Sequence, residues 1–318
     1  MRRALLATVV VASVAVGALP AAGARASGKT AEARQYAVGA LHRTFVDHSR
    51  PTDANGTAPA LFDRTIPALV LYPARGEARG EPVDDAPVAR KEAPYPLVVF
   101  SHGFTAKGPD YEARLLRGIA AAGYVVVAPT FPLTNRSAPG GARLVDYVNQ
   151  PADVSFVIDE MLRLDRRPGR LRGTIDTDRV GVTGHSLGAI TTLGLTYNAC
   201  CTDDRIDAAV PISGLQLPFR DQPWTWPAVP LLLVHGDQDQ TVPYDGSAAA
   251  YAAASPPKFL LTLVGAPHTP FTGAWQPVVT DTIVDFFDRY LEGERAALGR
   301  LEADGNVAGV ATLQSDPR

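Results

Sequence analysis

The sequence Val-Thr-Gly-His-Ser-Leu-Gly occupies residues 182–188 and is the most informative segment of the chain. A β-rich run leads into the pattern G-x-S-x-G, and helix-forming residues follow it. This order is typical of a serine held on a sharp turn between a strand and a helix. The two glycines suit such a turn, because the two backbones approach closely and a side chain would clash there. The hydroxyl of Ser186 would then be exposed at the N-terminus of the helix, where negative charge is favoured.

Strand-like and helix-like segments alternate on both sides of this motif. Short apolar runs such as 96–101 are typical of strands that are buried on both faces. The expected strands are residues 36–47, 64–72, 96–101, 124–128, 179–183, 208–213, 231–234 and 258–264. Strands that alternate with helices predict a parallel sheet with right-handed crossovers. We therefore predict a doubly wound α/β domain with a mostly parallel sheet of about eight strands.

A serine hydroxyl is a weak nucleophile without a base, so a histidine and an acid should accompany Ser186. In folds with this motif, the acid follows the serine in the chain and the histidine follows the acid. Among the six histidines, only His268 lies after both the serine and an acid at a strand end. It follows the expected strand 258–264, in a loop at the carboxyl end of the sheet, where functional residues collect. His268 is the predicted general base; the alternative is an ordinary surface histidine.

Two aspartates, Asp237 and Asp239, follow the expected strand 231–234, and either could orient the histidine. The other aspartate would then face solvent or cap a turn. His235 belongs to the same turn and is predicted to be structural. The residue types alone leave both aspartates open.

The N-terminus has the features of a segment that is removed after export. Two arginines precede an uncharged run at residues 4–19, and residues 24–26 (Ala-Arg-Ala) fit a small-residue cleavage site. The run is shorter than the ~20 strongly apolar residues that span a bilayer, which favours a signal peptide over a membrane anchor. We predict a signal peptide at residues 1–26, a secreted protein, and a single catalytic domain at residues 27–318.

Composition and charge limit the kinds of partner. The hydrophobic fraction of 46% is ample for a core, which should cover about residues 36–293 and leave a loose C-terminal tail. The net charge of −3 becomes −6 when the three arginines of residues 1–26 are removed. Scattered, mildly acidic charge gives no indication of nucleic acid or of an anionic membrane as a partner. No metal-ligand pattern is visible in the sequence, so we expect no metal or other cofactor. We also expect the protein to be a monomer.

The two cysteines, Cys200 and Cys201, are neighbours. They could be two small buried thiols, or they could form a vicinal disulfide that stiffens the turn before the next strand. Neighbouring residues close only a small ring that is far from ordinary disulfide geometry. The sequence leaves both states open, and a thiol nucleophile is disfavoured because no histidine pattern accompanies the pair.

The motifs resemble those of the α/β-hydrolase superfamily, in particular secreted bacterial serine esterases of the dienelactone-hydrolase-like and platelet-activating-factor-acetylhydrolase-like branch. The resemblance covers approximately residues 36–293. Besides G-x-S-x-G, it rests on segments 71–74, 96–103 and 150–154 and on the pattern HG-x-x-D-x-x-VP at 235–243. True dienelactone hydrolases have cysteine in place of Ser186, so lactone specificity does not carry over. Cutinase-type polyester hydrolases are similar in layout but differ around the acid and histidine motifs.

The resemblance implies further roles. It selects Asp239 over Asp237 as the acid that fixes the tautomer of His268. Ester hydrolysis passes through an oxyanion, which two backbone N–H groups commonly stabilise. One donor would be the N–H of Leu187, directly after the nucleophile. By similarity to the family's HG-x motif, the second would be the N–H of Phe104.

The expected substrate cleft is open. Only seventeen residues, 214–230, separate two expected strands, which is too short for a large cap domain. Trp224 and Trp226 lie in this segment and are predicted to contact flat, apolar esters or exposed polymer chains. The alternative is that they seal the segment against the core.

Together these features predict a secreted serine carboxylic ester hydrolase that acts on short to medium acyl esters through an acyl-serine. The substrate would be a small-molecule or polymeric ester. The alternatives are a polyester (cutinase-like) hydrolase, a lipid or phospholipid acyl hydrolase, a secreted acyltransferase, and a binding protein that has retained the fold.

Overall fold

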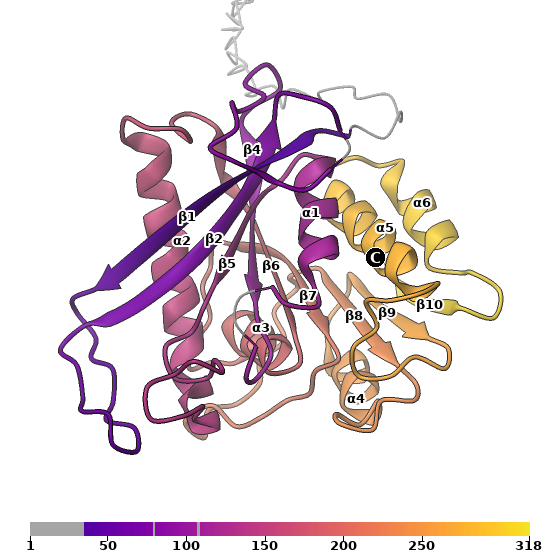
Figure 1. The fold of residues 1–318 in the computed structure, drawn as a ribbon. Helices are drawn as coiled ribbons and strands as arrows, with labels where there is room; N and C mark the ends of the chain where they lie inside the picture. Colours follow the sequence, from indigo (N-terminus) through magenta and orange to yellow (C-terminus); the bar gives the residue numbers. More distant parts are fainter. Residues whose placement is uncertain (1–34, 79, 107–108) are drawn as a thin grey trace, which may run out of the picture. The chain divides into compact units, whose positions relative to one another are not determined.

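A computed structural model describes residues 35–78, 80–106 and 109–318 (Figure 1). The predicted signal peptide at residues 1–26 lies outside the described residues. The strands form one ten-stranded sheet in the order β10-β9-β8-β7-β6-β4-β5-β2-β1-β3. Their bounds are β1 (Ala37–Asp47), β2 (Arg64–Ala74), β3 (Val83–Asp84), β4 (Tyr95–Ser101), β5 (Val125–Pro129), β6 (Ile175–His185), β7 (Ile206–Ile212), β8 (Leu231–Gly236), β9 (Lys258–Leu263) and β10 (Ala311–Asp316).

The centre of the sheet is parallel and its margins are mixed. The six strands from β9 to β5 in this order run parallel to their neighbours. The pairs β5–β2, β2–β1 and β9–β10 are antiparallel. The predicted doubly wound, mostly parallel sheet is confirmed, and its two unpredicted strands are β3 and β10.

Helices cover both faces of this sheet (Figure 1). They are α1 (Ala113–Ala122), α2 (Gln150–Arg166), α3 (Leu187–Tyr197), α4 (Asp245–Ala253), α5 (Trp275–Tyr290), α6 (Ala297–Asp304) and a short 3-10 helix, η1 (Leu144–Asn149). Side chains alternate along a strand, so each central strand fills two cores. In β4, Leu97 and Val99 pack in the core under α2, α3 and α4, whereas Val98 and Phe100 pack in the core under α1, α5 and α6.

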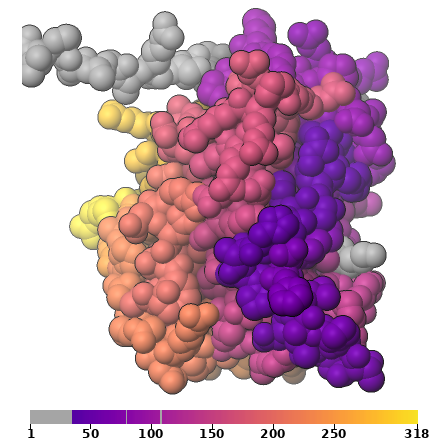
Figure 2. Space-filling model, turned by 90° about the vertical axis from the view of Figure 1, so that its left-hand side faces the viewer, coloured from indigo at the N-terminus to yellow at the C-terminus, as the bar shows by residue number. Residues whose placement is uncertain are grey.

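The first hairpin is anchored by a buried ion-pair network. Arg64, at the start of β2, is 1% exposed and contacts Asp153 in α2 at 2.6 Å and Asp146 in η1 at 2.7 Å. Arg50, in the β1–β2 connection, reaches Asp153 at 2.8 Å. This connection (indigo) and α2 (rose) lie side by side on the surface in Figure 2. Charges of both signs are paired here, which is the condition for burying them.

The prediction of a loose tail after residue 293 is wrong. β10 pairs with β9 over six residues and covers the edge of the sheet. In α6, Leu301 is fully buried, and Arg300 contacts Asp285 and Asp288 of α5 at 2.7 and 2.8 Å. The tail lacks a long apolar run because it contributes a single edge strand and one short helix, so hydrophobic periodicity did not indicate it.

The connection between β7 and β8 forms no cap domain over the carboxyl ends of the strands. Residues 213–230, all of them described, contain no helix and no strand beyond an isolated bridge at Trp224. The predicted absence of a large cap in this connection is confirmed. Among the described residues, no helix has both the length and the apolarity needed to cross a membrane.

Candidate active site

The turn between β6 and α3 has the backbone expected of an exposed nucleophile. Ser186 adopts φ 57° and ψ −117°, a conformation that L-residues rarely take. A Cβ atom on Gly184 would lie 2.3 Å from the carbonyl oxygen of Gly188, so only glycine fits this crossing of strand and helix. The N–H of Ser186 donates to Ile212 O of β7 at 2.9 Å, which fixes the turn to the sheet. The strained serine is therefore held in place by its neighbours.

Three side chains from three strand ends form a continuous hydrogen-bonded chain. Nε2 of His268 lies 2.8 Å from Oγ of Ser186, and Nδ1 of His268 lies 2.7 Å from Oδ2 of Asp239. Ser186 follows β6, Asp239 follows β8 and His268 follows β9. The structure thus brings together the nucleophile, base and acid that the sequence predicts. Because the carboxylate accepts, Nδ1 carries the proton and Nε2 is free to accept the serine hydroxyl.

Asp239 is held as a carboxylate by several donors. Oδ1 accepts the N–H groups of Thr241 and Val242 at 2.7 and 2.8 Å, and Oδ2 also faces Nε2 of His235 at 3.1 Å. Burial alone would raise the pKa of Asp239, but the hydrogen bonds from His268, Val242 and Thr241 outweigh it and lower the pKa. The acid is therefore ionised next to the histidine that it orients.

The neighbouring Asp237 has a different role. Its Oδ1 accepts the N–H of Gly265 at 2.7 Å and so closes the turn after β9. The structure therefore gives the two candidate acids separate partners, with only Asp239 on His268.

The pKa of His268 is lowered from its ordinary value of 6.5. Burial is the largest cause, the hydrogen bond to Asp239 acts in the opposite direction, and the nearby His185 lowers the pKa further. A lowered pKa keeps the imidazole neutral, which is the state that can accept a proton from Ser186.

The loop after β4 packs directly against the nucleophile. A Cβ atom on Gly103 would lie 3.3 Å from Cβ of Ser186, so the backbone of the next residue, Phe104, runs beside the serine. His102 orients this loop: its Nε2 accepts the N–H of Phe131 at 2.9 Å, and its Nδ1 therefore donates to Gly103 O at 2.8 Å. Phe104, the predicted oxyanion donor, therefore follows directly after the glycine that meets Ser186.

Leu187 is the first residue of α3. The N–H groups of a first helical turn have no partner within the helix and carry partial positive charge. The oxyanion roles of Leu187 and Phe104 remain predictions. The helix N-terminus and the loop beside Ser186 are positions from which backbone N–H groups could serve this role.

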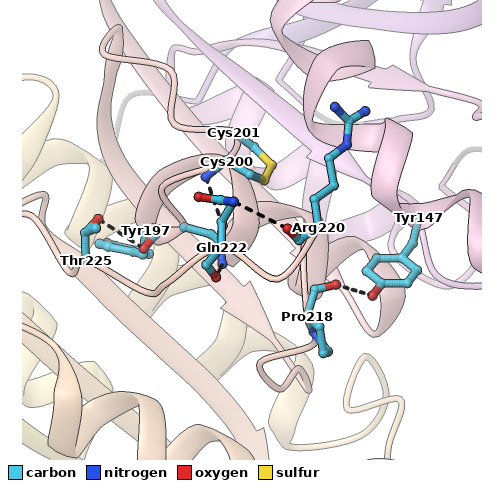
Figure 3. The surroundings of a disulfide bond; sticks show 9 residues. Tyr147, Tyr197, Cys200, Cys201, Pro218, Arg220, Gln222 and Thr225 are labelled. Carbon is cyan, nitrogen blue, oxygen red and sulfur yellow. Dashed lines mark hydrogen bonds between the residues drawn. A yellow bond between two sulfur atoms is a disulfide. The ribbon is translucent and has the colours of Figure 1, made fainter.

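Trp224 and Trp226 do not lie at the nucleophile. Thr225, between them, donates its N–H to the carbonyl of Tyr197, the last residue of α3, at 2.9 Å, and its hydroxyl faces the same carbonyl (Figure 3). Because α3 begins beside Ser186 and rises 1.5 Å per residue, this end lies about 15 Å away. The ring of Trp226 packs on Trp224 at 5.7 Å and on Tyr197 at 5.1 Å. Both tryptophans pack against the core, which favours the sealing alternative over the predicted contact with substrate.

Cys200 and Cys201 form a disulfide at the same end of α3 (Figure 3). Asn198 connects this turn to the 213–230 segment, because its Oδ1 accepts the N–H of Cys200 and its amide donates to Gln222 O, both at 3.0 Å. Of the two states left open by the sequence, the structure has the vicinal disulfide.

Sequence reasoning missed a buried acid beside the site. Glu112 lies 2.8 Å from His185, the residue before the nucleophile. No motif indicated it, because Glu112 precedes a helix in a loop and meets His185 only through the fold. Within residues 35–78, 80–106 and 109–318, no three His, Cys, Asp or Glu side chains are grouped as metal ligands.

The topology, the turn at Ser186 and the order of the three strand ends define an α/β-hydrolase fold, and the chain is an α/β-hydrolase-fold protein. The family model for chlorophyllase matches residues 86–220. Bis(hydroxyethyl) terephthalate hydrolase from Streptomyces coelicolor (strain ATCC BAA-471 / A3(2) / M145) is 31% identical over 147 residues, which cover 42% of this chain. The chain spans slightly less than half, 45%, of that curated relative's length.

A solved structure of similar fold is the ferulic acid esterase from Streptomyces cinnamoneus. The two structures share a TM-score of 0.61 and 20% sequence identity, over 85% of this chain and 93% of the esterase. The expected resemblance to esterases of the α/β-hydrolase type is confirmed by these comparisons.

Proposed function

We propose that this protein is a serine carboxylic ester hydrolase that acts through an acyl-serine intermediate. The observation that carries the proposal is the hydrogen-bonded chain from Ser186 Oγ through His268 to Asp239, with contacts of 2.8 and 2.7 Å. The backbone strain at Ser186 and the lowered pKa of His268 support it, because such features concentrate at functional sites. The similarity to two ester-cleaving enzymes supports the same reaction class.

The proposed reaction follows from the geometry. His268 accepts the proton of Ser186 while the oxygen attacks the ester carbonyl, and the carboxylate of Asp239 stabilises the imidazolium. The N–H groups of Phe104 and Leu187 would hold the oxyanion. The imidazolium then protonates the leaving alcohol, and an acyl-serine remains. Water, activated by the same imidazole, releases the acid and restores the serine hydroxyl.

The substrate we propose is a short to medium acyl ester that enters from an uncapped surface. Ser186 is half-buried, the side chain of His268 is 18% exposed and Phe104 is 38% exposed, so the nucleophile is reachable from solvent. An acyltransferase would share the first half of the reaction, and partition of the acyl-serine to an added alcohol would reveal it.

A second candidate substrate is an ester of an aromatic acid, including a polyester. The two named relatives act on esters of terephthalic and ferulic acid, both of which are aromatic. An apolar cluster begins next to the nucleophile and extends along α3: Leu187, Ile190 and Phe219 are buried, and Leu215, Leu217 and Trp224 are partly buried against them. Its near end at Leu187 adjoins Ser186, and apolar side chains at that position suit a planar ring.

The test is hydrolysis of p-nitrophenyl acetate, butyrate and palmitate, of bis(hydroxyethyl) terephthalate and methyl ferulate, and of a polyester film. Wild type and Ser186→Ala are compared. We expect turnover of at least one ester by wild type, loss of turnover in Ser186→Ala, and an acyl adduct on Ser186 by mass spectrometry after rapid acid quench. Equal inertness of both proteins towards every ester would overturn the proposal.

We further propose that the mature protein is secreted as a monomer after cleavage behind residue 26. The charged start, apolar run and Ala-Arg-Ala site support this proposal. N-terminal sequencing of protein recovered from the culture medium, with light scattering of the same sample, tests it. A start at Met1 or a dimeric mass would contradict it.

A further inference from the structure

A second acid–histidine contact lies beside the proposed catalytic residues. Glu112, immediately before α1, and His185, the last residue of β6, are 1% and 5% exposed. Oε1 of Glu112 lies 2.8 Å from Nδ1 of His185. Both carboxyl oxygens of Glu112 are buried, and neither makes a regular hydrogen bond among the described residues, so the approach to His185 is the contact that compensates the burial of this acid.

The contact of His185 with His268 shows that Nε2 of His185 carries a proton. Nε2 is 2.8 Å from the backbone carbonyl oxygen of His268, and a carbonyl can only accept. Nε2 therefore carries a proton. The other ring nitrogen of His185, Nδ1, faces Oε1 of Glu112 at 2.8 Å.

His185 connects Glu112 to His268, the proposed general base, through the backbone carbonyl of His268. The ring of His185 lies 5.0 Å from that of His268 and meets Phe271 edge-on at 5.0 Å. His185 thus contacts the 265–271 loop at three places: the backbone carbonyl of His268, the imidazole ring of His268 and the ring of Phe271. It is also covalently next to Ser186, so one ring connects the nucleophile with the loop that carries its base.

We propose that Glu112 and His185 are positioning residues: Glu112 fixes the orientation and tautomer of His185, whose Nε2–H holds the carbonyl of His268 so that Nε2 of His268 faces Ser186. This inference rests on the proposed function. Neither residue touches the reacting atoms. The carboxylate–histidine arrangement of Asp239 and His268 is thereby repeated one layer further from the substrate.

Titratable groups on neighbouring loops also face the Glu112–His185 pair. His102, after β4, is buried and within electrostatic range of Glu112, and it is neutral because its Nε2 accepts from a backbone N–H. His268 faces His185 from the loop after β9, and Asp239 lies behind it. A change at Glu112 is therefore transmitted to the base through His185.

The test compares Glu112→Leu with the conservative Glu112→Gln, using an ester that wild type hydrolyses. In Glu112→Gln, the amide N–H can donate to Nδ1 and keep the proton on Nε2. In Glu112→Leu, Nδ1 loses its partner and the tautomer is no longer fixed. Because a misplacement of ~1 Å can cost about 100-fold in rate, we expect kcat of Glu112→Leu to fall at least about 10-fold. KM should stay within about 2-fold, and Glu112→Gln should keep kcat within about 3-fold of wild type.

Two controls separate positioning from stability. Leu301→Ala opens a buried cavity in α6, far from the site, and should lower Tm without changing kcat. In a double-mutant cycle, His185→Leu should lower kcat, and adding Glu112→Leu to it should have little further effect, because the two residues act in series. Equal kcat losses in Glu112→Leu and Glu112→Gln, or additive losses in the cycle, would overturn the proposal.

A readout independent of activity distinguishes failure of this inference from failure of the proposed function. Nitrogen-15 spectra of the imidazoles report the tautomers of His185 and His268. We expect His185 to keep its proton on Nε2 in wild type and in Glu112→Gln, and to lose that fixed position in Glu112→Leu, with a changed His268 signal. Unchanged spectra in Glu112→Leu would refute the positioning role. An inactive wild type with the expected spectra would refute the hydrolase proposal alone.

Discussion

The backbone of Gly188 presses against the carbonyl group of Ser101, so that a Cβ atom at residue 188 would lie 1.9 Å from that oxygen. This contact joins the start of α3 to the end of β4, the strand that leads into the loop of Phe104. The nucleophile turn and the loop proposed to hold the oxyanion are therefore fitted to each other through one glycine.

Gly188→Ala should consequently separate these two segments. The methyl group can be accommodated only if the backbone shifts, so we expect at least about 100-fold lower kcat/KM or failure to fold. The measurement is ester hydrolysis together with circular dichroism. Gly299→Ala, in α6 with no atom near the new Cβ, is the matched control and should behave as wild type. Near-normal activity of Gly188→Ala would show that the contact is not required.

Asp239→Asn should remove control over the tautomer of His268. The amide can turn its N–H towards Nδ1, which would leave the proton on the nitrogen that faces Ser186. We expect kcat to fall by about 10³- to 10⁴-fold with little change in Tm. Asp237→Asn keeps an oxygen for the N–H of Gly265 and should retain activity within about 3-fold. A larger loss in Asp237→Asn than in Asp239→Asn would reverse the assignment.

The acid limb of the pH–rate profile should report His268. Catalysis needs the neutral imidazole, and burial lowers the pKa of this group below 6.5. The value of kcat/KM for a non-ionising ester should therefore stay near its plateau as pH falls to 6.5 and decline only below that value. Initial rates between pH 4.5 and 8.5, with circular dichroism to confirm the fold, provide the check. A midpoint above pH 6.5 would contradict the expectation.

Arg64→Leu should strongly destabilise the protein. The change leaves the buried carboxylates of Asp146 and Asp153 without their principal counter-charge. Removing one partner of such a network costs about 3–5 kcal/mol of the free energy of unfolding. Urea denaturation measures it, and Arg114→Leu on the exposed surface of α1 should change the free energy by less than about 0.5 kcal/mol. Similar effects of the two changes would mean that the network contributes little.

Trp226→Ala tests whether the two tryptophans are structural. The ring packs on Trp224 and Tyr197 and is only partly buried, so its loss should cost about 2 kcal/mol, less than the ~3–5 kcal/mol of a fully buried ring. KM for each ester should remain within about 2-fold of wild type. A several-fold rise in KM with unchanged Tm would restore the substrate-binding interpretation.

Local sequence patterns were enough to predict the central strands of the sheet and the turn that carries Ser186. The apolar run at 96–101 and the G-x-S-x-G turn correspond to β4 and to the β6–α3 junction, because strands buried on both faces leave an unmistakable hydrophobic signature. The rule that the acid follows the serine and precedes the histidine reduced six histidines to His268, and the structure places it at hydrogen-bond distance from Ser186.

Features that depend on long-range contacts could not be predicted in this way. Glu112 is one polar residue in a loop, and its burial against His185 arises only when α1 packs beside β6. β10 is mostly polar, because one edge strand needs few apolar residues, so its pairing with β9 left no periodic signal. The role of Trp224 depended on the direction of α3, which carries residue 198 away from Ser186.

The three side chains that meet at Ser186 are contributed by strand ends spread over 82 residues of chain, and the last of them follows β9. No fragment that stops short of His268 can assemble the constellation, however well its own part of the sheet has formed. Completion of the site therefore requires β9 and the loop that follows it, as well as the strands that carry Ser186 and Asp239.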